Sequence, residues 1–338
     1  MIGIVSVGMV TAVGLDAPSS CAAMRARIDG FQETRYISTP GEWLIGAPVP
    51  LPRNWVGMKR MAHLAAGAIC EAFERVPEAR GQTTLILCLS EEGRPGRPVG
   101  DNGDLLRQIN EIVEADPSAR SRVAAHGRPA GHVALERARR MIDSGEARYV
   151  MIAGVDSYLT AGSISHFLRR ERLLTASNPN GFIPGEAAAA VLCTRASGHG
   201  IHLAGLGLSR EPASIYNESD LPLRSDGMTS AYRVALEEAG FEMNRLGYRI
   251  SDLIGEQYWF KQTALASLRL LRGRHEFQDL WSPTESIGNV GAAVVPLMLG
   301  MAFIAAEKGY AAGNPALVEA SNDEGACGAA ILTARPLR

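Results

Sequence analysis

The sequence lacks any apolar run of the roughly 20 residues that a membrane-spanning helix requires. The longest such run, 290–306, contains Pro296 and ends before Glu307 and Lys308. The first residues, MIGIVS, also lack the basic segment that opens a secretory signal peptide. We therefore expect a cytoplasmic protein that neither enters nor binds a membrane.

Neither charge sign dominates, because 34 Lys and Arg face 36 Asp and Glu, a formal net charge of -2 at pH 7. This balance gives no indication of a nucleic-acid partner. The five cysteines are odd in number and scattered, and no pair has the spacing of metal ligands. The sequence therefore predicts reduced thiols, and we expect neither a metal nor a cofactor.

Aromatic residues make up only 6% of the 338 residues, whereas 36 are glycine, which indicates close packing between layers. Short apolar runs alternate with segments of helical periodicity, the pattern of an α/β fold with a largely parallel sheet. Residues 30–57, rich in Pro, Gly and Trp, instead indicate an irregular surface excursion. The strands are expected at 2–7, 83–89, 149–153, 187–194, 202–208, 248–254, 316–320 and 326–333, and the main helices at 16–27, 58–75, 104–115, 129–142, 163–174, 230–238, 261–271 and 290–308.

The stretch 125–157 predicts a turn, a helix and a buried strand. Pro129 suits the first turn of a helix, where its missing N–H would be unpaired anyway. The apolar run from Tyr149 to Ala153 is typical of a strand covered on both faces. The helix N-terminus, a common place for chemistry in strand–helix folds, holds Gly127, Arg128 and Pro129, and none of these is a nucleophile.

The two halves of the chain share a weak sequence repeat. In the first half a helix ends at Gly145, and the next strand leads to Val155-Asp156-Ser157. In the second half a helix ends at Gly309, and the next strand leads to Ser321-Asn322-Asp323. We interpret these as two copies of one unit, residues 1–200 and 201–338, although α/β proteins without duplication show similar echoes.

Three motifs together resemble the β-ketoacyl synthases of the thiolase superfamily. They are GMVTAVG at 8–14, RLL at 172–174 with NGFIPGEAA at 180–188, and SIGNVGAA at 286–293. The resemblance implies an α/β protein with a five-layered αβαβα fold and internal duplication. It also implies a homodimer, which we expect to form where the strand Thr83–Leu89 pairs with its symmetry mate and covers Leu85, Ile86 and Leu87.

The resemblance further implies a catalytic cysteine, two histidines and a lysine, and none stands at its expected position. If HVAL at 132–135 matches the segment after the nucleophile, the cysteine position falls at or beside Arg128. The first histidine should follow a strand near 248–256, where SDLIGE stands, and the second falls at Asn289. Thr284 to Ser286 occupy the lysine region. Four losses in separate segments predict a degenerate site with no catalytic residue.

Other side chains in this candidate pocket have two readings each. His126 and His132 could titrate, but a hydrogen-bonded structural role is favoured. Asp252 and Glu256 could be paired carboxylates for acid–base chemistry, but a helix cap and a solvated acid are favoured. Cys327 could approach the cavity, although packing is favoured.

Arg128 stays protonated and opposes the positive end of its helix, so it should turn outward or find an anion. Paired with a carboxylate such as Asp252, it would fill the pocket as a structural plug. The aromatic run Tyr258-Trp259-Phe260 predicts either packing at a helix start or an exposed interaction patch.

The leading functional hypothesis is a non-catalytic scaffold that binds a protein partner. Short ketosynthase-like proteins with Asp-Leu-x-Gly-Glu in place of the histidine motif resemble accessory proteins of type VI secretion, which suggests an adaptor that loads an effector or its chaperone. One alternative is a β-ketoacyl-ACP synthase-type acyltransferase with relocated catalytic residues. Another is a subunit like a chain length factor, which pairs with an active ketosynthase.

Overall fold

The computed structural model describes residues 1–38, 41–115, 121–197, 200–274 and 277–335. The first half contains β1 (Ile2–Val10), α1 (Ala17–Arg25), β2 (Gln32–Ile37), β3 (Trp43–Gly46), α2 (Gly57–Glu74), β4 (Thr83–Leu89), α3 (Asn102–Val113), β5 (Arg122–Ala125), α4 (Ala130–Asp143), β6 (Tyr149–Ser157), α5 (Ala161–Arg169) and β7 (Glu186–Arg195). The second contains β8 (Gly200–Arg210), α6 (Asp226–Ala239), β9 (Tyr248–Ser251), α7 (Gln257–Leu270), β10 (Asp279–Trp281), α8 (Thr284–Ile287), α9 (Val294–Glu307), β11 (Ala316–Ser321) and β12 (Ala326–Arg335).

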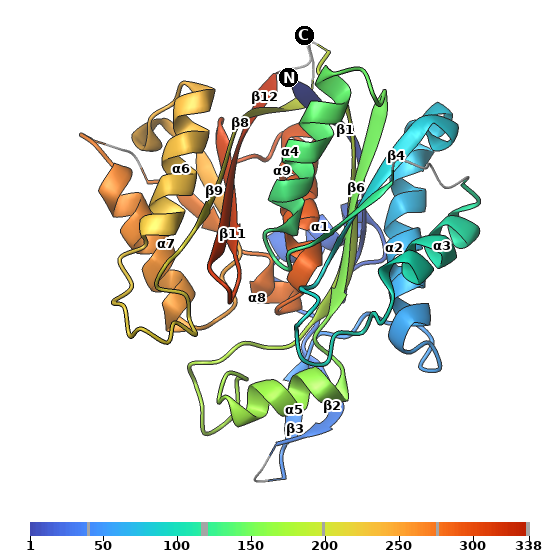
Figure 1. The fold of residues 1–338 in the computed structure, drawn as a ribbon, viewed down its shortest axis with the longest axis vertical. Coiled ribbons are helices and arrows are strands. Elements are labelled where there is room, and N and C mark those ends of the chain that lie inside the picture. Colours follow the sequence, from blue (N-terminus) through green and yellow to red (C-terminus); the bar gives the residue numbers. More distant parts are fainter. Residues whose placement is uncertain (39–40, 116–120, 198–199, 275–276, 336–338) are drawn as a thin grey trace.

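The predicted five layers are confirmed. Helices α2 and α3 cover the outer face of the first half of the sheet, α6 and α7 cover the outer face of the second half, and α1, α4 and α9 lie between the halves (Figure 1). Every residue from Val294 to Ala305 in α9 is buried, as expected of a helix enclosed between two sheets. The core therefore extends on both sides of the middle layer.

The sheet topology confirms the internal duplication. The strand order is β10-β9-β11-β12-β8-β1-β7-β6-β4-β5, and β1 and β8 pair only through Gly3 with His202 and Ile4 with Ile201. In one half β4 is parallel to β5 and β6, and β7 is antiparallel to β6 and β1. In the other half β9 is parallel to β10 and β11, and β12 is antiparallel to β11 and β8. We propose that the division between residues 200 and 201, where β8 begins, separates the two units.

Both units bring an outer helix unusually close to their first strand. A Cβ atom on Gly8 of β1 would lie 2.0 Å from the carbonyl oxygen of Ala68 in α2. A Cβ atom on Gly207 of β8 would lie 1.9 Å from the carbonyl oxygen of Ala231 in α6. Only glycine permits these contacts, which gives the high glycine content a structural cause.

Three predictions about the fold are wrong. The sheet is mixed instead of largely parallel, because five of its nine strand pairs are antiparallel. Strand Thr83–Leu89 is not an edge strand, because β6 pairs with one of its sides and β5 with the other, so it cannot pair with a symmetry mate. The excursion at 30–57 is not wholly irregular, because β2 and β3 form an antiparallel pair; its positions 39 and 40 lie outside the described residues. Together with α5, this pair projects at the end of the molecule opposite the termini (Figure 1).

Candidate functional site

The candidate site lies where the loops after β4, β6 and β11 meet the N-terminus of α4. These segments enclose a cavity of about 140 Å³, whose lining includes Glu91, Arg94, Arg128, Tyr158, His166 and Asp323. Gly127 opens the turn into α4 with φ of 61°, and a Cβ atom there would lie 2.1 Å from the Glu91 Oε1. Glycine at 127 therefore lets the Glu91 carboxylate approach the turn before the helix.

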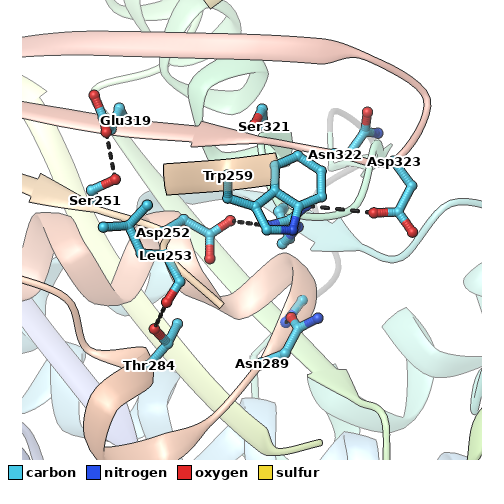
Figure 2. Close-up of polar contacts among 12 residues, drawn as sticks. Ser251, Asp252, Leu253, Trp259, Thr284, Asn289, Glu319, Ser321, Asn322 and Asp323 are labelled. Atoms are coloured by element: carbon cyan, nitrogen blue, oxygen red, sulfur yellow. Dashed lines mark hydrogen bonds and ion pairs between the residues drawn. The ribbon is translucent and has the colours of Figure 1, made fainter. Parts of the chain in front are cut away.

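Arg128 turns inward rather than to solvent. Its side chain is 2% exposed, and its Nη1 donates a hydrogen bond to the Asp252 Oδ2 at 3.0 Å. Its Nη2 lies 3.5 Å from the Asp323 Oδ1, and its guanidinium carbon lies 3.9 Å from the centre of the Trp259 ring. Asp252 and Asp323 lie on either side of Trp259 (Figure 2). Two carboxylates and an aromatic face thus offset the unfavourable position of a cation at a helix N-terminus.

Glu256 pairs with a different arginine. Arg172 donates from Nε and Nη2 to the two Glu256 oxygens at 2.6 and 2.7 Å, and from Nη1 to the Asp323 Oδ2 at 2.6 Å. The Trp259 Nε1 also donates to the Glu256 Oε2 at 2.9 Å. The reading of Glu256 as a solvated acid is therefore wrong, because its side chain is buried and fully engaged.

A third buried arginine lines the same cavity. Arg94 donates to both oxygens of Asp156, at 2.7 and 2.6 Å. The Asp156 Oδ2 accepts a further bond at 3.0 Å from the backbone N–H of Ala292, just before α9. The ends of β6 and β11, which the sequence repeat had paired, therefore supply the carboxylates Asp156 and Asp323 to one cluster.

Of the candidate residues predicted from the sequence, only Arg128 lines the cavity. Asn289 accepts a bond at 3.1 Å from the N–H of Gly291, and the His132 Nε2 lies 3.1 Å from the Val318 carbonyl oxygen. Burial lowers the pKa of His132 to about 4, so its favoured structural role holds. The backbone carbonyl of His126 accepts a bond at 3.1 Å from Asn322, and the Cys327 Sγ is buried 3.4 Å from the Gly325 carbonyl oxygen. Of these candidates, the structure joins only Arg128 and Asp252 directly.

No thiol reaches this cavity. Cys21, Cys88, Cys193 and Cys327 are buried, and burial raises the pKa of each thiol to about 12. Cys70 is half-buried, and burial raises its pKa as well. Since the thiolate is the reactive form, none of these thiols is activated in the way that a nucleophilic cysteine requires.

Sequence reasoning missed several lining residues, among them Glu91, Arg94, Tyr158 and His166. Glu91 is the second residue after β4, and Tyr158 follows directly after β6. Polar residues just after buried strands could have indicated these lining positions, because parallel strands end at the same edge of a sheet. His166 carries no such signal, since it comes from α5 on the projecting segment.

Two negative findings bound the chemistry of the described residues. No group of three or more His, Cys, Asp and Glu side chains among them is arranged to hold a metal ion. Across the same part of the chain, no helix is both long and apolar enough to cross a membrane.

A second buried polar cluster lies beside Asp252. Burial raises the pKa of Asp252 to about 6, although Arg128 lowers it. The neighbouring Glu319 on β11 accepts a hydrogen bond from the hydroxyl of Ser251 (Figure 2). It accepts another from the hydroxyl of Thr263, and it has no cationic partner within the described residues. Burial raises its pKa from 4.5 to about 8. Glu319 is therefore largely protonated at neutral pH.

We predict that Arg128→Ala lowers the free energy of unfolding by about 1–3 kcal/mol, because Asp252 is left buried without its cation. Denaturant titration measures this change. Arg140→Ala, on the exposed side of the same helix, is the matched control and should stay within about 0.5 kcal/mol of the wild type. In the Arg128→Ala background, Asp252→Asn should lower the free energy of unfolding by less than it does in the wild type. An unchanged stability in Arg128→Ala would show that the pair does not support the fold.

We predict that Glu319→Gln flattens the dependence of stability on pH. The folded state binds the Glu319 proton more tightly than the unfolded chain, so this group stabilises the fold most below pH 4.5 and loses that effect as the pH rises to about 8. Melting temperatures between pH 5 and pH 8 should therefore fall more steeply for the wild type. Glu324→Gln, at an exposed position, serves as the control. Parallel curves for the wild type and Glu319→Gln would contradict this assignment.

Comparisons with known proteins agree on one fold. Residues 129–199 match the family model of the β-ketoacyl synthase N-terminal domain. A ketosynthase in complex with its chain length factor from Xenorhabdus doucetiae superposes with a TM-score of 0.78 at 17% identity, covering 98% of each chain. A β-ketoacyl synthase from Burkholderia phymatum STM815 gives 0.73 at 15% identity, over 100% of this chain and 99% of that one.

A ketosynthase from module 6 of the bacillaene synthase of Bacillus subtilis 168 gives a TM-score of 0.77 at 12% identity, over 99% of this chain and 72% of that one. No curated protein sequence matches the chain. At these identities the structural matches establish the fold, and the family model adds a sequence match that begins at the first turn of α4. The chain therefore has the fold of the ketosynthases, and its residues 129–199 resemble the β-ketoacyl synthase N-terminal domain.

Proposed function

We propose that this protein is a non-catalytic ketosynthase-like scaffold that binds a protein partner. The observation that carries the proposal is the buried contact of Arg128 with Asp252 and Trp259 at the N-terminus of α4. A guanidinium that stays protonated can act neither as nucleophile nor as general base. Held between a carboxylate and an indole ring, it also occupies space that a substrate at this helix end would need.

The type VI secretion adaptor is the specific form of this proposal. Its support is the segment Ser251–Glu256, whose two carboxylates pair with Arg128 and Arg172 instead of offering a histidine. The partner would be a secretion effector or its chaperone, and the two proteins would bind in the cytoplasm. Purification of the natively expressed protein with its bound proteins, identified by mass spectrometry, tests this role.

Solved structures of this fold favour one second candidate. The Xenorhabdus doucetiae structure contains a ketosynthase in complex with its chain length factor, so a protein of this fold can pair with a second protein. Under this alternative the purified partner would be a ketosynthase that retains its cysteine. The same mass-spectrometry experiment therefore separates the two candidates.

We predict no condensation activity with malonyl- and acyl-carrier-protein donors. The described cavity holds one imidazole, His166, and no thiol, so neither acyl transfer to sulfur nor the usual decarboxylation chemistry has its groups. Product formation should equal that of a blank without protein. Turnover that disappears in Cys327→Ala would instead support an acyltransferase with relocated residues.

We predict a homodimer that forms through β5 instead of β4. Strand β5 ends the first half of the sheet, and no described strand pairs with its outer side. Isologous pairing there would continue the sheet across two subunits. Light scattering at micromolar concentration should give twice the chain mass of 36.1 kDa.

A substitution on the edge tests the location of this interface. Val123→Lys on β5 should shift the protein toward monomer, because a lysine on an edge strand opposes further pairing. Val234→Lys, on an exposed face of α6, should leave the mass unchanged. A monomeric wild type, or a dimer insensitive to Val123→Lys, would count against pairing through β5.

A further inference from the structure

A larger cavity lies away from the candidate site. It has a volume of about 490 Å³ and is formed by α1, β10 and α8, with the end of α9 and the residues just after it. It shares no lining residue with the 140 Å³ cavity around Arg128. Its volume falls within the range of roughly 300–1,000 Å³ typical of small-molecule sites.

The floor of this α1–β10 cavity is an uncovered end of the middle layer. Met24 of α1, Trp281 of β10 and Tyr310 after α9 are only partly buried and pack against the main core, and Met301 of α9 lines the same space. The Trp281 ring packs against Tyr248 at a tilt of 45° with centroids 4.6 Å apart, which fixes one wall of the cavity. Side chains of this kind favour an apolar occupant, since its burial removes apolar surface from water.

The rim on the α1 side is cationic. Arg25 and Arg27 line the cavity, both are exposed, and neither forms an ion pair with a described carboxylate. The guanidinium of Arg25 lies 4.3 Å from the centre of the Tyr310 ring, which orients it while leaving its N–H donors available. The acidic residues Asp279 and Glu285 lie on the opposite side of the rim, on β10 and α8. A ligand with one negatively charged end would therefore place that end on the α1 side.

We propose that the α1–β10 cavity binds an amphipathic organic anion, with its apolar chain on Met24, Met301 and Trp281 and its carboxylate on Arg25 and Arg27. Arginine suits this role because its planar fork donates two parallel hydrogen bonds to a carboxylate. The site goes beyond the proposed scaffold function. Its test uses a small-molecule probe and no protein partner, so either assignment can fail alone.

The experiment uses dansyl-undecanoate as a fluorescent probe on the full chain. We expect saturable binding at one site, with energy transfer from Trp281 to the dansyl group. Trp281→Phe should abolish most of that transfer, whereas Trp43→Phe, on the exposed hairpin strand β3, should preserve it. Unlabelled dodecanoate should displace the probe, and dodecyltrimethylammonium should not.

Charge reversal tests the role of the rim. Arg25→Glu should weaken probe binding by about tenfold or more, the loss expected for a charge-assisted hydrogen bond. Arg140→Glu, on the surface of α4, should leave the affinity unchanged, and Arg27→Glu repeats the test outside the helix should Arg25→Glu perturb folding. Absence of binding, equal competition by the cationic amphiphile, or an affinity unaffected by both rim variants would overturn the proposal.

Discussion

The structure depends most on a buried network of three arginines at the ends of the central strands. Arg128 and Arg172 come from the first half of the chain, and their partners Asp252, Glu256 and Asp323 come from the second. Arg94 instead pairs with Asp156 inside the first half. Each charge costs several kcal/mol to bury unless it is paired, so the two halves must stay in register for the pairs to form. The network therefore fixes how the two repeats face each other at this end of the molecule.

The same network explains how a cation is tolerated at the N-terminus of α4. The helix dipole disfavours Arg128 there, but Asp252, Asp323 and the face of Trp259 surround its guanidinium. Asp156 of β6 lies near the N-terminus of α9, the helix that corresponds to α4 in the second half. There it accepts a hydrogen bond from the N–H of Ala292 and two from Arg94. The two related helix ends are thus occupied by charged side chains of this chain itself, which supports a scaffold role.

The two cavities differ in what they offer. Around Arg128 the space is small, and its guanidinium groups are already engaged by carboxylates. Beside α1 the space is larger, its floor is apolar and its two arginines have no acidic partner among the described residues. Binding a ligand in the cavity beside α1 would be favourable without breaking any ion pair. Binding a ligand in the cavity around Arg128 would require breaking ion pairs.

Periodicity and the turn residues of the sequence were sufficient to predict the alternating strands and helices, the buried strand at Tyr149 and the duplicated order. These features follow from local patterns in the chain. The identity of Arg128 at a helix start was equally visible. Only the tertiary structure decided that Asp252 pairs with Arg128 while Glu256 pairs with Arg172, and that β5 covers the outer side of β4. These contacts join residues far apart in the chain, and a charge that looks solvated in sequence becomes buried only when distant strand ends are brought together.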